Sequence, residues 1–211
     1  MIPRDIEKQH LKRILSALDG KTLSARRDRA LVLLALTTGA RVSELVSLDL
    51  DQVLENPRTG KIRILAITSI RKDQIKGKRE AGILVIPEKT RRALRAWIDA
   101  ARKAGLIKLP PKNRAPLFVV IHGCTAKNAK PGNRLSKRSA QNMFHRLQER
   151  IGIVPVYRFH DLRHAFQSAL AAAGVHPYTI AAAARLRNVA TTVRYVHTRT
   201  EEIKKAVESV W

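Results

Sequence analysis

Residues 30–36 form an uninterrupted apolar run, Ala-Leu-Val-Leu-Leu-Ala-Leu, which constrains the fold more than any other feature of this chain. A start signal at Ser24 precedes the run and Gly39 follows it, so the spacing predicts a helix between these two residues. A helix that is apolar on nearly all sides is typical of a buried helix. The chain has the material for a core around it, because 45 % of its 211 residues are hydrophobic, and this length fits one domain.

Apolar periodicity predicts a mainly α-helical α+β fold with a small antiparallel sheet. Pro87 is expected in the first turn of its helix. The connection over residues 69–82 is expected to be an exposed basic hairpin, and residues 110–136 a long loop around a short apolar run. The expected helices lie at residues 6–18, 24–38, 41–48, 87–104, 137–151, 161–173, 177–185, 190–196 and 201–210, and the expected strands at 62–67 and 83–86.

The charge balance indicates a polyanionic partner. Lys and Arg number 41 against 17 Asp and Glu, which gives a formal net charge of +24, and the basic residues are spread over the whole sequence. This distribution favours a positive face of a folded domain over a disordered basic arm. The two Trp, three Tyr and four Phe are too few for a surface that stacks single-stranded bases, so double-stranded DNA is the favoured partner.

Cysteine usage and hydropathy restrict the compartment. A single cysteine, Cys124, excludes a disulfide framework and a zinc ribbon, and it is compatible with a reducing cytoplasm. The chain has no apolar stretch near 18 residues and its first ten residues lack a signal-peptide core. We therefore expect a cytoplasmic protein without a membrane partner.

The run His-Asp-Leu-Arg-His at residues 160–164 is the most informative short motif. If Asp161 lies in the first turn of a helix, His160 and Arg163 share one face while Leu162 points to the core. A paired imidazole and guanidinium form an oxyanion site. Taken alone, the motif is more often an ordinary helix start with solvated His and Arg side chains.

Three motifs in order carry a resemblance to a known family. They are Thr-Gly-Ala-Arg-Val-Ser-Glu-Leu at residues 38–45, the run at 160–164, and Thr-Thr-Val-Arg-Tyr at 191–195. Together they resemble the catalytic domain of the tyrosine recombinases, the phage integrase and Xer family, over about residues 5–200. The resemblance implies a helical catalytic domain with a three-stranded antiparallel sheet, and a site-specific recombinase that cleaves and rejoins duplex DNA through a 3′-phosphotyrosyl intermediate.

The resemblance also implies roles for individual residues. Arg41 is the first catalytic arginine, His160 and Arg163 form the second box, and Tyr195 is the nucleophile. Glu44 and His164 support this site. The Lys-Gly-Lys-Arg-Glu run at residues 76–80 resembles the family pattern whose lysine protonates the leaving oxygen, which favours Lys76, with Lys78 as the alternative and Lys72 as a remote one.

These residue types suit the implied chemistry. Negative charge spreads over the phosphate oxygens in the transition state, and two permanently charged guanidinium forks match it better than lysines do. Tyrosine has an unperturbed pKa near 10 and needs cationic surroundings and an acceptor such as His160 before it attacks. Because the phosphotyrosyl bond stores the energy of the broken bond, no metal and no cofactor are expected.

One position departs from the family pattern. Nine residues before the nucleophile the family has a His or Trp that donates to the phosphate, whereas this chain has Leu186. Losing one such donor typically costs about 10²–10³ in rate, unless Arg185 or Arg187 replaces it. The alternative function is therefore a catalytically weakened DNA-binding protein of recombinase fold, acting as regulator or accessory partner. A basic RNA-binding protein of ribosomal type explains the charge but leaves the ordered motifs to coincidence.

The expected organisation is one catalytic domain over residues 1–211 without the family's N-terminal core-binding domain. This is expected either of a truncated chain or of a single-domain protein that resembles the fimbrial-type DNA invertases. Residues 201–211 are expected to be exchanged between protomers, as the family's last segment commonly is. We therefore expect a homo-oligomer, a tetramer, on DNA, with accessory DNA-bending proteins and a nucleoid-associated location.

Overall fold

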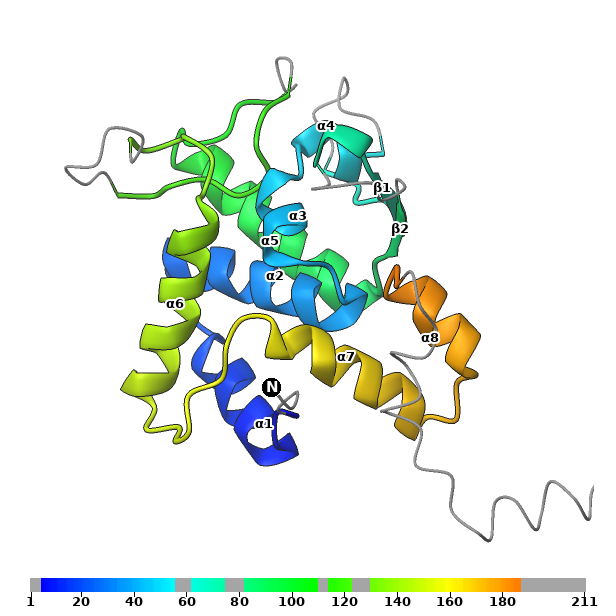
Figure 1. The fold of residues 1–211 in the computed structure, drawn as a ribbon. Coiled ribbons are helices and arrows are strands. Elements are labelled where there is room, and N and C mark those ends of the chain that lie inside the picture. Colours follow the sequence, from blue (N-terminus) through cyan, green and yellow to red (C-terminus); the bar gives the residue numbers. More distant parts are fainter. Residues whose placement is uncertain (1–4, 56–61, 75–81, 110–113, 123–129, 187–211) are drawn as a thin grey trace, which may run out of the picture. The chain divides into compact units, whose positions relative to one another are not determined.

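The computed structural model describes residues 5–55, 62–74, 82–109, 114–122 and 130–186 (Figure 1). The chain divides into two compact units, residues 1–166 and 167–211. The helices are α1 Lys8–Ala17, α2 Leu23–Thr38, α3 Val42–Ser47, α4 Leu50–Val53, α5 Glu88–Lys103, α6 Lys137–Arg150, α7 Asp161–Ala172 and α8 Pro177–Ala183, and the strands are β1 Ile67–Ile70 and β2 Gly82–Val85, with a 3₁₀ turn η1 at Lys72–Gln74. The helices expected at 190–196 and 201–210 lie outside the described residues.

Helix α2 is the buried helix of the first unit, as the apolar run predicts. All residues from Ala30 to Ala35 are buried. Its start differs from the expected one, because Thr22 and not Ser24 is the N-cap: the Thr22 hydroxyl accepts a hydrogen bond from the Ala25 amide at 3.1 Å. Both residues can cap a helix, and the earlier one lengthens α2 by two residues before the apolar run.

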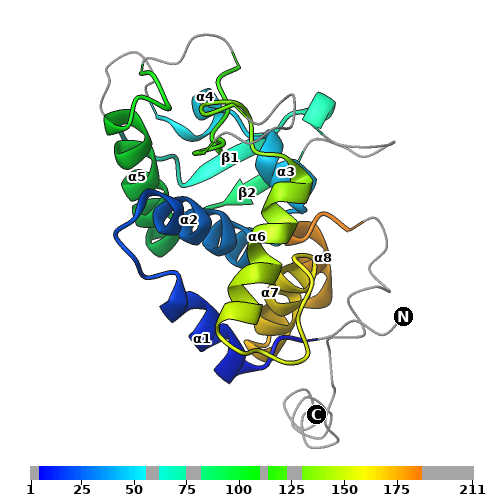
Figure 2. The ribbon, with the colours of Figure 1, turned by 90° about the vertical axis from the view of Figure 1, so that its left-hand side faces the viewer.

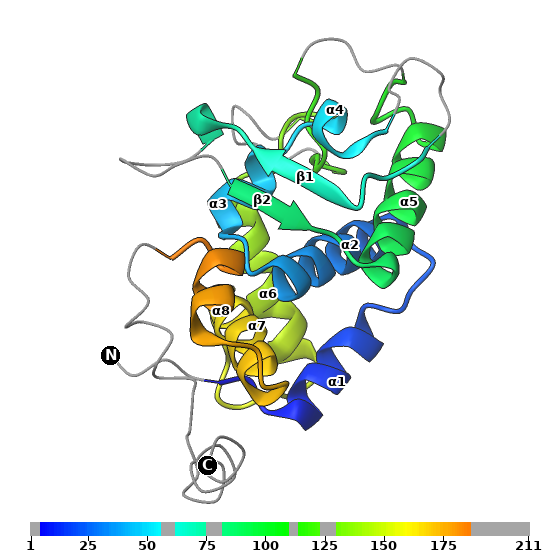
Figure 3. The same ribbon diagram turned by 90° about the vertical axis from the view of Figure 1, so that its right-hand side faces the viewer.

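Helix α5 packs along α2, as Figures 1 and 3 show. The hydroxyls of Thr37 and Thr90 lie 2.9 Å apart where the two helices meet, and Leu94 and Trp97 of α5 are fully buried. Pro87 is the N-cap of α5 and lies one position before the first turn in which the sequence predicts it. Figure 2 shows α6 beside α3 and α1, so helices surround α2 in this unit.

The sheet is antiparallel, but its first strand lies later than the sequence predicts. Strands β1 and β2 pair with Ile67 opposite Val85 and Ile70 opposite Gly82. The segment before β1 pairs elsewhere: Ile64 bridges Leu54, and the Leu65 amide donates to the Val53 carbonyl at 2.8 Å. The predicted strand at 62–67 is thus one extended stretch with two successive partners. Among the described residues the sheet has two strands, and Leu54 joins Ile64 only by an isolated bridge.

The described part of residues 110–136 contributes to the core. Leu117, Phe118 and Val119, from the apolar run that the sequence shows inside this connection, are buried. Their backbone is held by the Leu117 amide, which donates to the Leu48 carbonyl at 2.9 Å, and by a bridge between Val119 and Arg134. The indole of Trp97 donates to the Leu117 carbonyl at 2.8 Å, which ties this segment to α5. A search of the described helices for one able to cross a membrane finds none.

Candidate active site

The turn between α2 and α3 places Arg41. Gly39 ends α2 with a φ of 60°, in the left-handed region that glycine adopts without strain, and its amide donates to the Ala35 carbonyl at 3.0 Å. Two residues later, Arg41 is the N-cap of α3 with extended backbone angles. The sharp turn therefore fixes the Cα of Arg41 between two helix ends.

Glu44 orients the Arg41 side chain from one turn further along α3. Its Oε2 accepts a hydrogen bond from the Arg41 amide at 2.8 Å, and its Oε1 accepts one from Arg41 Nη1 at 3.2 Å. The Glu44 side chain is only 4 % exposed, whereas that of Arg41 is 23 % exposed. Glu44 is thus a buried anchor, and Arg41 keeps part of its guanidinium accessible.

Arg163 reaches the same turn from α7. Its side chain is buried, and Nη1 donates a hydrogen bond to the carbonyl oxygen of Gly39. Phe166, one turn further along α7, packs closely against the same glycine: a Cβ placed on Gly39 would collide with the Phe166 ring. Leu162 is fully buried, as the helix phase predicts. The two arginines of the separate sequence motifs therefore meet at one backbone turn.

The pKa values of both histidines of the second motif are lowered. The rings of His160 and His164 meet edge to face with centroids 5.0 Å apart. Desolvation, followed by the electrostatic effects of His164, Arg163 and Arg41, lowers the pKa of His160 to about 4, although the Asp161 carboxylate opposes the shift. Desolvation also lowers the pKa of His164, although the carboxylates of Asp161 and Asp5 oppose it. A neutral imidazole at position 160 can accept a proton, which an imidazolium cannot.

Asp161 fixes the start of α7. Its side chain is 1 % exposed and its Oδ2 accepts a hydrogen bond from the Arg158 amide at 2.8 Å. The Asp161 amide in turn donates to the Arg158 carbonyl at 2.9 Å. This closed turn fixes the first residue of α7, directly after His160.

The remaining predicted site residues do not join the two arginines among the described contacts. Tyr195, Lys76 and Lys78 lie outside the described residues. Lys72 is an exposed residue of η1. Leu186 is half-buried in the second unit and follows Arg185, whose φ is 52°.

A search for metal ligands gives no candidate. Within the part of the chain that the structure describes, no cluster of three or more His, Cys, Asp and Glu side chains could hold a metal ion.

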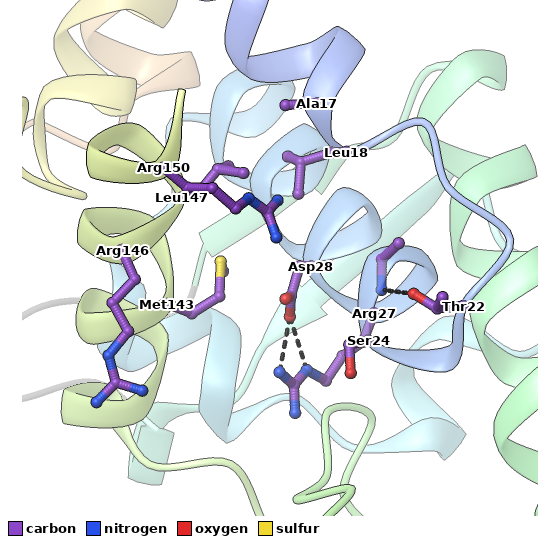
Figure 4. A pocket seen from close by; sticks show the side chains of 11 residues that line it. Ala17, Leu18, Thr22, Ser24, Arg27, Asp28, Met143, Arg146, Leu147 and Arg150 are labelled. Atoms are coloured by element: carbon purple, nitrogen blue, oxygen red, sulfur yellow. Dashed lines mark hydrogen bonds and ion pairs between the residues drawn. The ribbon is translucent and has the colours of Figure 1, made fainter. Parts of the chain in front are cut away.

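A charged hollow of about 370 Å³ lies elsewhere, between α1, α2 and α6 (Figure 4). Asp28 is paired there with Arg27, with 2.8 Å between Asp28 Oδ1 and Arg27 Nη2. Burial raises the pKa of Asp28 despite the positive charges of Arg27 and Arg150. Among the described residues, none of the motifs at 38–45 and 160–164 lines this hollow, so it is distinct from the arginine site.

The sequence did not reveal every polar anchor near the site. Asp49 is buried and binds Arg71 and Arg134, two residues that lie 22 and 85 positions away. Its only sequence signal is a carboxylate that precedes a short apolar stretch, a pattern equally typical of a helix cap. The partners could not be found from spacing, because they come from different connections of the fold.

Two arginines and a neutral histidine on a helical domain with a small antiparallel sheet, in this chain order, define a tyrosine recombinase catalytic fold. The chain belongs to the phage integrase family, whose sequence profile matches residues 4–202. It is 24 % identical over 196 residues to tyrosine recombinase XerC of Thermodesulfovibrio yellowstonii. This match covers 93 % of this chain and 58 % of that protein. The chain thus spans about three fifths of the length of this relative.

Solved structures show the same fold. The catalytic domain of bacteriophage HP1 integrase superposes with a TM-score of 0.60 at 18 % identity, over 98 % of this chain and 95 % of that one. The Tn1549 transposon integrase, solved in complex with circular intermediate DNA, superposes with a TM-score of 0.68 at 16 % identity, over 100 % of this chain and 68 % of that one.

Proposed function

We propose that this chain is the catalytic domain of a site-specific DNA recombinase that cleaves and rejoins duplex DNA through a 3′-phosphotyrosyl intermediate. The observation that carries the proposal is the meeting of Arg41 and Arg163 at the α2–α3 turn, each fixed by a separate hydrogen bond. Guanidinium groups held in advance bind the charge of a five-coordinate phosphate without reorganising during the reaction.

We propose that the reaction proceeds in two exchanges at phosphorus. The Tyr195 oxygen attacks the phosphorus, and its proton passes to an acceptor, a role that the neutral His160 can fill. The bond from phosphorus to the 5′ oxygen breaks, and this oxygen takes a proton from Lys76, with Lys78 as the alternative donor. The 3′-phosphotyrosyl bond then holds the strand until a 5′ hydroxyl attacks it and releases Tyr195. No cofactor or metal takes part in these steps.

The proposed partner is double-stranded DNA, and the net charge of +24 supports it. Recombination joins two duplexes, so we propose a homotetramer on DNA in which residues 201–211 are exchanged between protomers, assisted by DNA-bending proteins. The corresponding location is the nucleoid in the cytoplasm. We propose that residues 1–211 form one catalytic domain and that these residues do not include a core-binding domain.

Leu186 supports a second candidate, a DNA-binding protein of the same fold with weakened catalysis. A leucine cannot donate a hydrogen bond to the phosphate. The active recombinase is favoured over this candidate because the arginine site keeps its buried supports, Glu44 at 3 % exposure and Asp161 at 1 %. A chain that only binds DNA has no need of an inflexible pair of guanidinium groups and a neutral imidazole.

Covalent trapping tests the proposal. The protein is incubated without divalent metal with nicked suicide duplexes that carry the DNA flanking its gene, and a denaturing gel detects protein joined to DNA. We expect a joined species in the wild type and none in Tyr195→Phe. Tyr178→Phe is the matched control, because this tyrosine is 67 % exposed on α8, and it should leave the joined species unchanged.

The wild type and both variants could also form no joined species while they still bind duplex DNA in a salt-sensitive way. This result would contradict the recombinase proposal and support the weakened binding protein. Leu186→His then separates its causes. Recovery of the joined species would show that the missing donor limits the chemistry, whereas no recovery would show that the site lacks more than this donor.

A further inference from the structure

Three of the exposed apolar side chains that the structure describes lie on one face of the β1–β2 sheet. Ile67 of β1 and Ile83 and Val85 of β2 are between 57 and 62 % exposed. Ile67 lies opposite Val85, and Ser69 lies opposite Ile83, so these four side chains are on the same side of the two strands. These four residues form the outer face of the sheet.

The opposite face of the sheet packs in the core. Thr68, Ile70 and Leu84 alternate with the outer residues and are buried, and Ile70 and Leu84 belong to the hydrophobic core of the first unit. An antiparallel sheet commonly buries one face and presents polar side chains to water on the other. The outer face departs from this pattern, because three of its four residues are apolar and β-branched.

This departure does not reflect a generally apolar surface. Charged residues make up 27 % of the chain, yet none of the four outer-face residues is charged. Figure 3 looks onto the two strands, and no described element of the first unit passes in front of them. Because contiguous exposed apolar side chains mark surfaces that another molecule covers, the outer face is a candidate docking surface.

The covering molecule needs an apolar patch of its own, and a second copy of this chain has one. The described residues include five large apolar side chains that are exposed. The two outside the sheet are Val154, between α6 and α7, and Tyr178, in the second unit. Within the described part of the chain, the outer face is therefore the one patch that can match itself. A two-fold contact joins the same surface of both copies.

The charges beside β1 also suit a second copy. Arg71, directly after β1, is paired with Asp49 and Asp51. Arg63, before β1, is paired with Glu55 at 2.9 Å. Guanidinium groups that already have carboxylate partners repel a second copy less than unpaired ones do, and they offer less to an acidic partner. The local charge therefore favours a copy of the same chain over an acidic protein.

The size of the outer face sets the strength of the contact. A stable dimer buries about 800 Å² on each partner, from about 20–30 residues. Four residues are far fewer, so the association is weak and reversible. The net charge of +24 opposes it at long range, and salt screens this repulsion. Self-association should therefore strengthen as salt rises, whereas binding to a polyanion weakens.

We infer that the outer face of the β1–β2 sheet is a self-association surface, which packs against the same face of a second copy of this chain. The contact is distinct from the proposed exchange of residues 201–211. It goes beyond the recombinase function, because it forms without DNA. A duplex that binds two copies raises their effective concentration and so favours the same contact.

Sedimentation equilibrium of the free protein tests the inference. We expect a monomer in about 50 mM NaCl and a monomer–dimer equilibrium in about 500 mM NaCl. Val85→Thr keeps the shape and strand propensity of the side chain but places a hydroxyl in the contact of both copies, so it should weaken dimerisation by about 10-fold or more. Ser69→Val makes the whole face apolar and should strengthen dimerisation by about 10-fold.

Val154→Thr is the matched control, because it makes the same change at a side chain that is 81 % exposed outside the sheet. It should leave dimerisation unchanged. None of the three substitutions alters a buried side chain, so the midpoint of urea unfolding should equal that of the wild type in each variant.

A wild type that remains monomeric at high salt would overturn the inference, and so would equal responses to Val85→Thr and Val154→Thr. A lower urea midpoint in Val85→Thr, without a change in self-association, would overturn it as well, because the chain itself would then cover the outer face. Covalent trapping is measured separately. A protein that dimerises as expected but joins no DNA would contradict the proposed function alone.

Discussion

The two arginines and the turn before α7 are each held by a hydrogen bond to a buried group. Glu44 holds Arg41, the Gly39 carbonyl receives Arg163, and Asp161 closes the turn that carries His160. Such support lowers the freedom that a long side chain would lose on binding a phosphate. The proposed function of the site therefore depends also on the residues that hold these side chains in place.

Glu44→Gln tests this dependence. The amide keeps the size of the carboxylate but removes its charge, and hydrogen bonds to charged groups contribute about 1.5–3 kcal/mol. We expect the free energy of unfolding to fall by about that amount, and covalent trapping to slow by about 10-fold, less than the 10²–10³ that loss of a whole donor costs. Urea unfolding and trapping rates measure both effects.

Glu149→Gln is the control for Glu44→Gln, because this carboxylate is exposed on α6. It should change neither quantity. A normal trapping rate in Glu44→Gln would contradict the orienting role of Glu44.

The pH dependence of stability tests the neutral state of His160. Its folded-state pKa of about 4 lies below the ordinary 6.5, so the unfolded chain binds the proton more tightly than the folded one. The folded state is favoured above pH 6.5, and this contribution is lost as the pH falls from 6.5 towards 4. Urea unfolding should show a larger loss over this window in the wild type than in His160→Gln.

His122→Gln removes an exposed histidine and serves as the control for His160→Gln. Its unfolding should follow the wild type at each pH. Equal losses in the wild type and His160→Gln would show that His160 does not stay neutral in the folded protein.

At the scale of elements, the α2–α3 turn is the part on which the arginine site depends. Gly39 combines a φ of 60° with contact to the Phe166 ring and a carbonyl bound by Arg163. A side chain at this position therefore affects the end of α2, the first turns of α7 and the base of the site together.

Gly39→Ala should destabilise the fold by about 2–5 kcal/mol, since a left-handed non-glycine residue costs about 1–2 kcal/mol and overpacking about 1–3 kcal/mol. Gly152→Ala is a matched control, because Gly152 has a φ of 65° and no atom within 4 Å of an added Cβ. It should lose only about 1–2 kcal/mol. Equal losses in urea unfolding would contradict the proposed collision with Phe166.

At the scale of the whole molecule, the net charge of +24 is the property that a test of the proposed DNA partner can use. Cations that neutralise phosphates release counterions, so binding weakens in proportion to the number of contacts as salt rises. DNA and RNA both carry charged phosphates, so the net charge alone does not distinguish them. A basic RNA-binding protein therefore explains the net charge equally well.

Salt titration tests the duplex interface. For about 6–10 phosphate contacts, the affinity for duplex DNA should fall by about 10³–10⁵-fold between 50 and 200 mM salt. Fluorescence anisotropy measures the affinity, and competition at fixed salt with an RNA of equal length gives the preference. A weak salt dependence, or a preference for RNA, would contradict the duplex DNA partner.

The sequence by itself determined the features that depend on neighbours along the chain. The buried α2, the approximate positions of the described helices and the burial of Leu162 follow from side-chain spacing of three to four residues, which is local. The mainly helical fold and the strand at β2 follow in the same way. The resemblance then assigned roles to Arg41, Glu44 and the second motif, and the two arginines do meet in the structure.

Only the tertiary structure decided which distant groups share a bond. The contact of Arg163 with the Gly39 carbonyl spans 124 positions, and Asp49 binds residues 22 and 85 positions away. The stretch 62–67 likewise has strand propensity throughout, but only pairing shows that it changes partners before β1. Local propensity depends on a residue and its near neighbours, whereas these bonds depend on how the connections between elements return to α3, and no periodicity in the sequence records that.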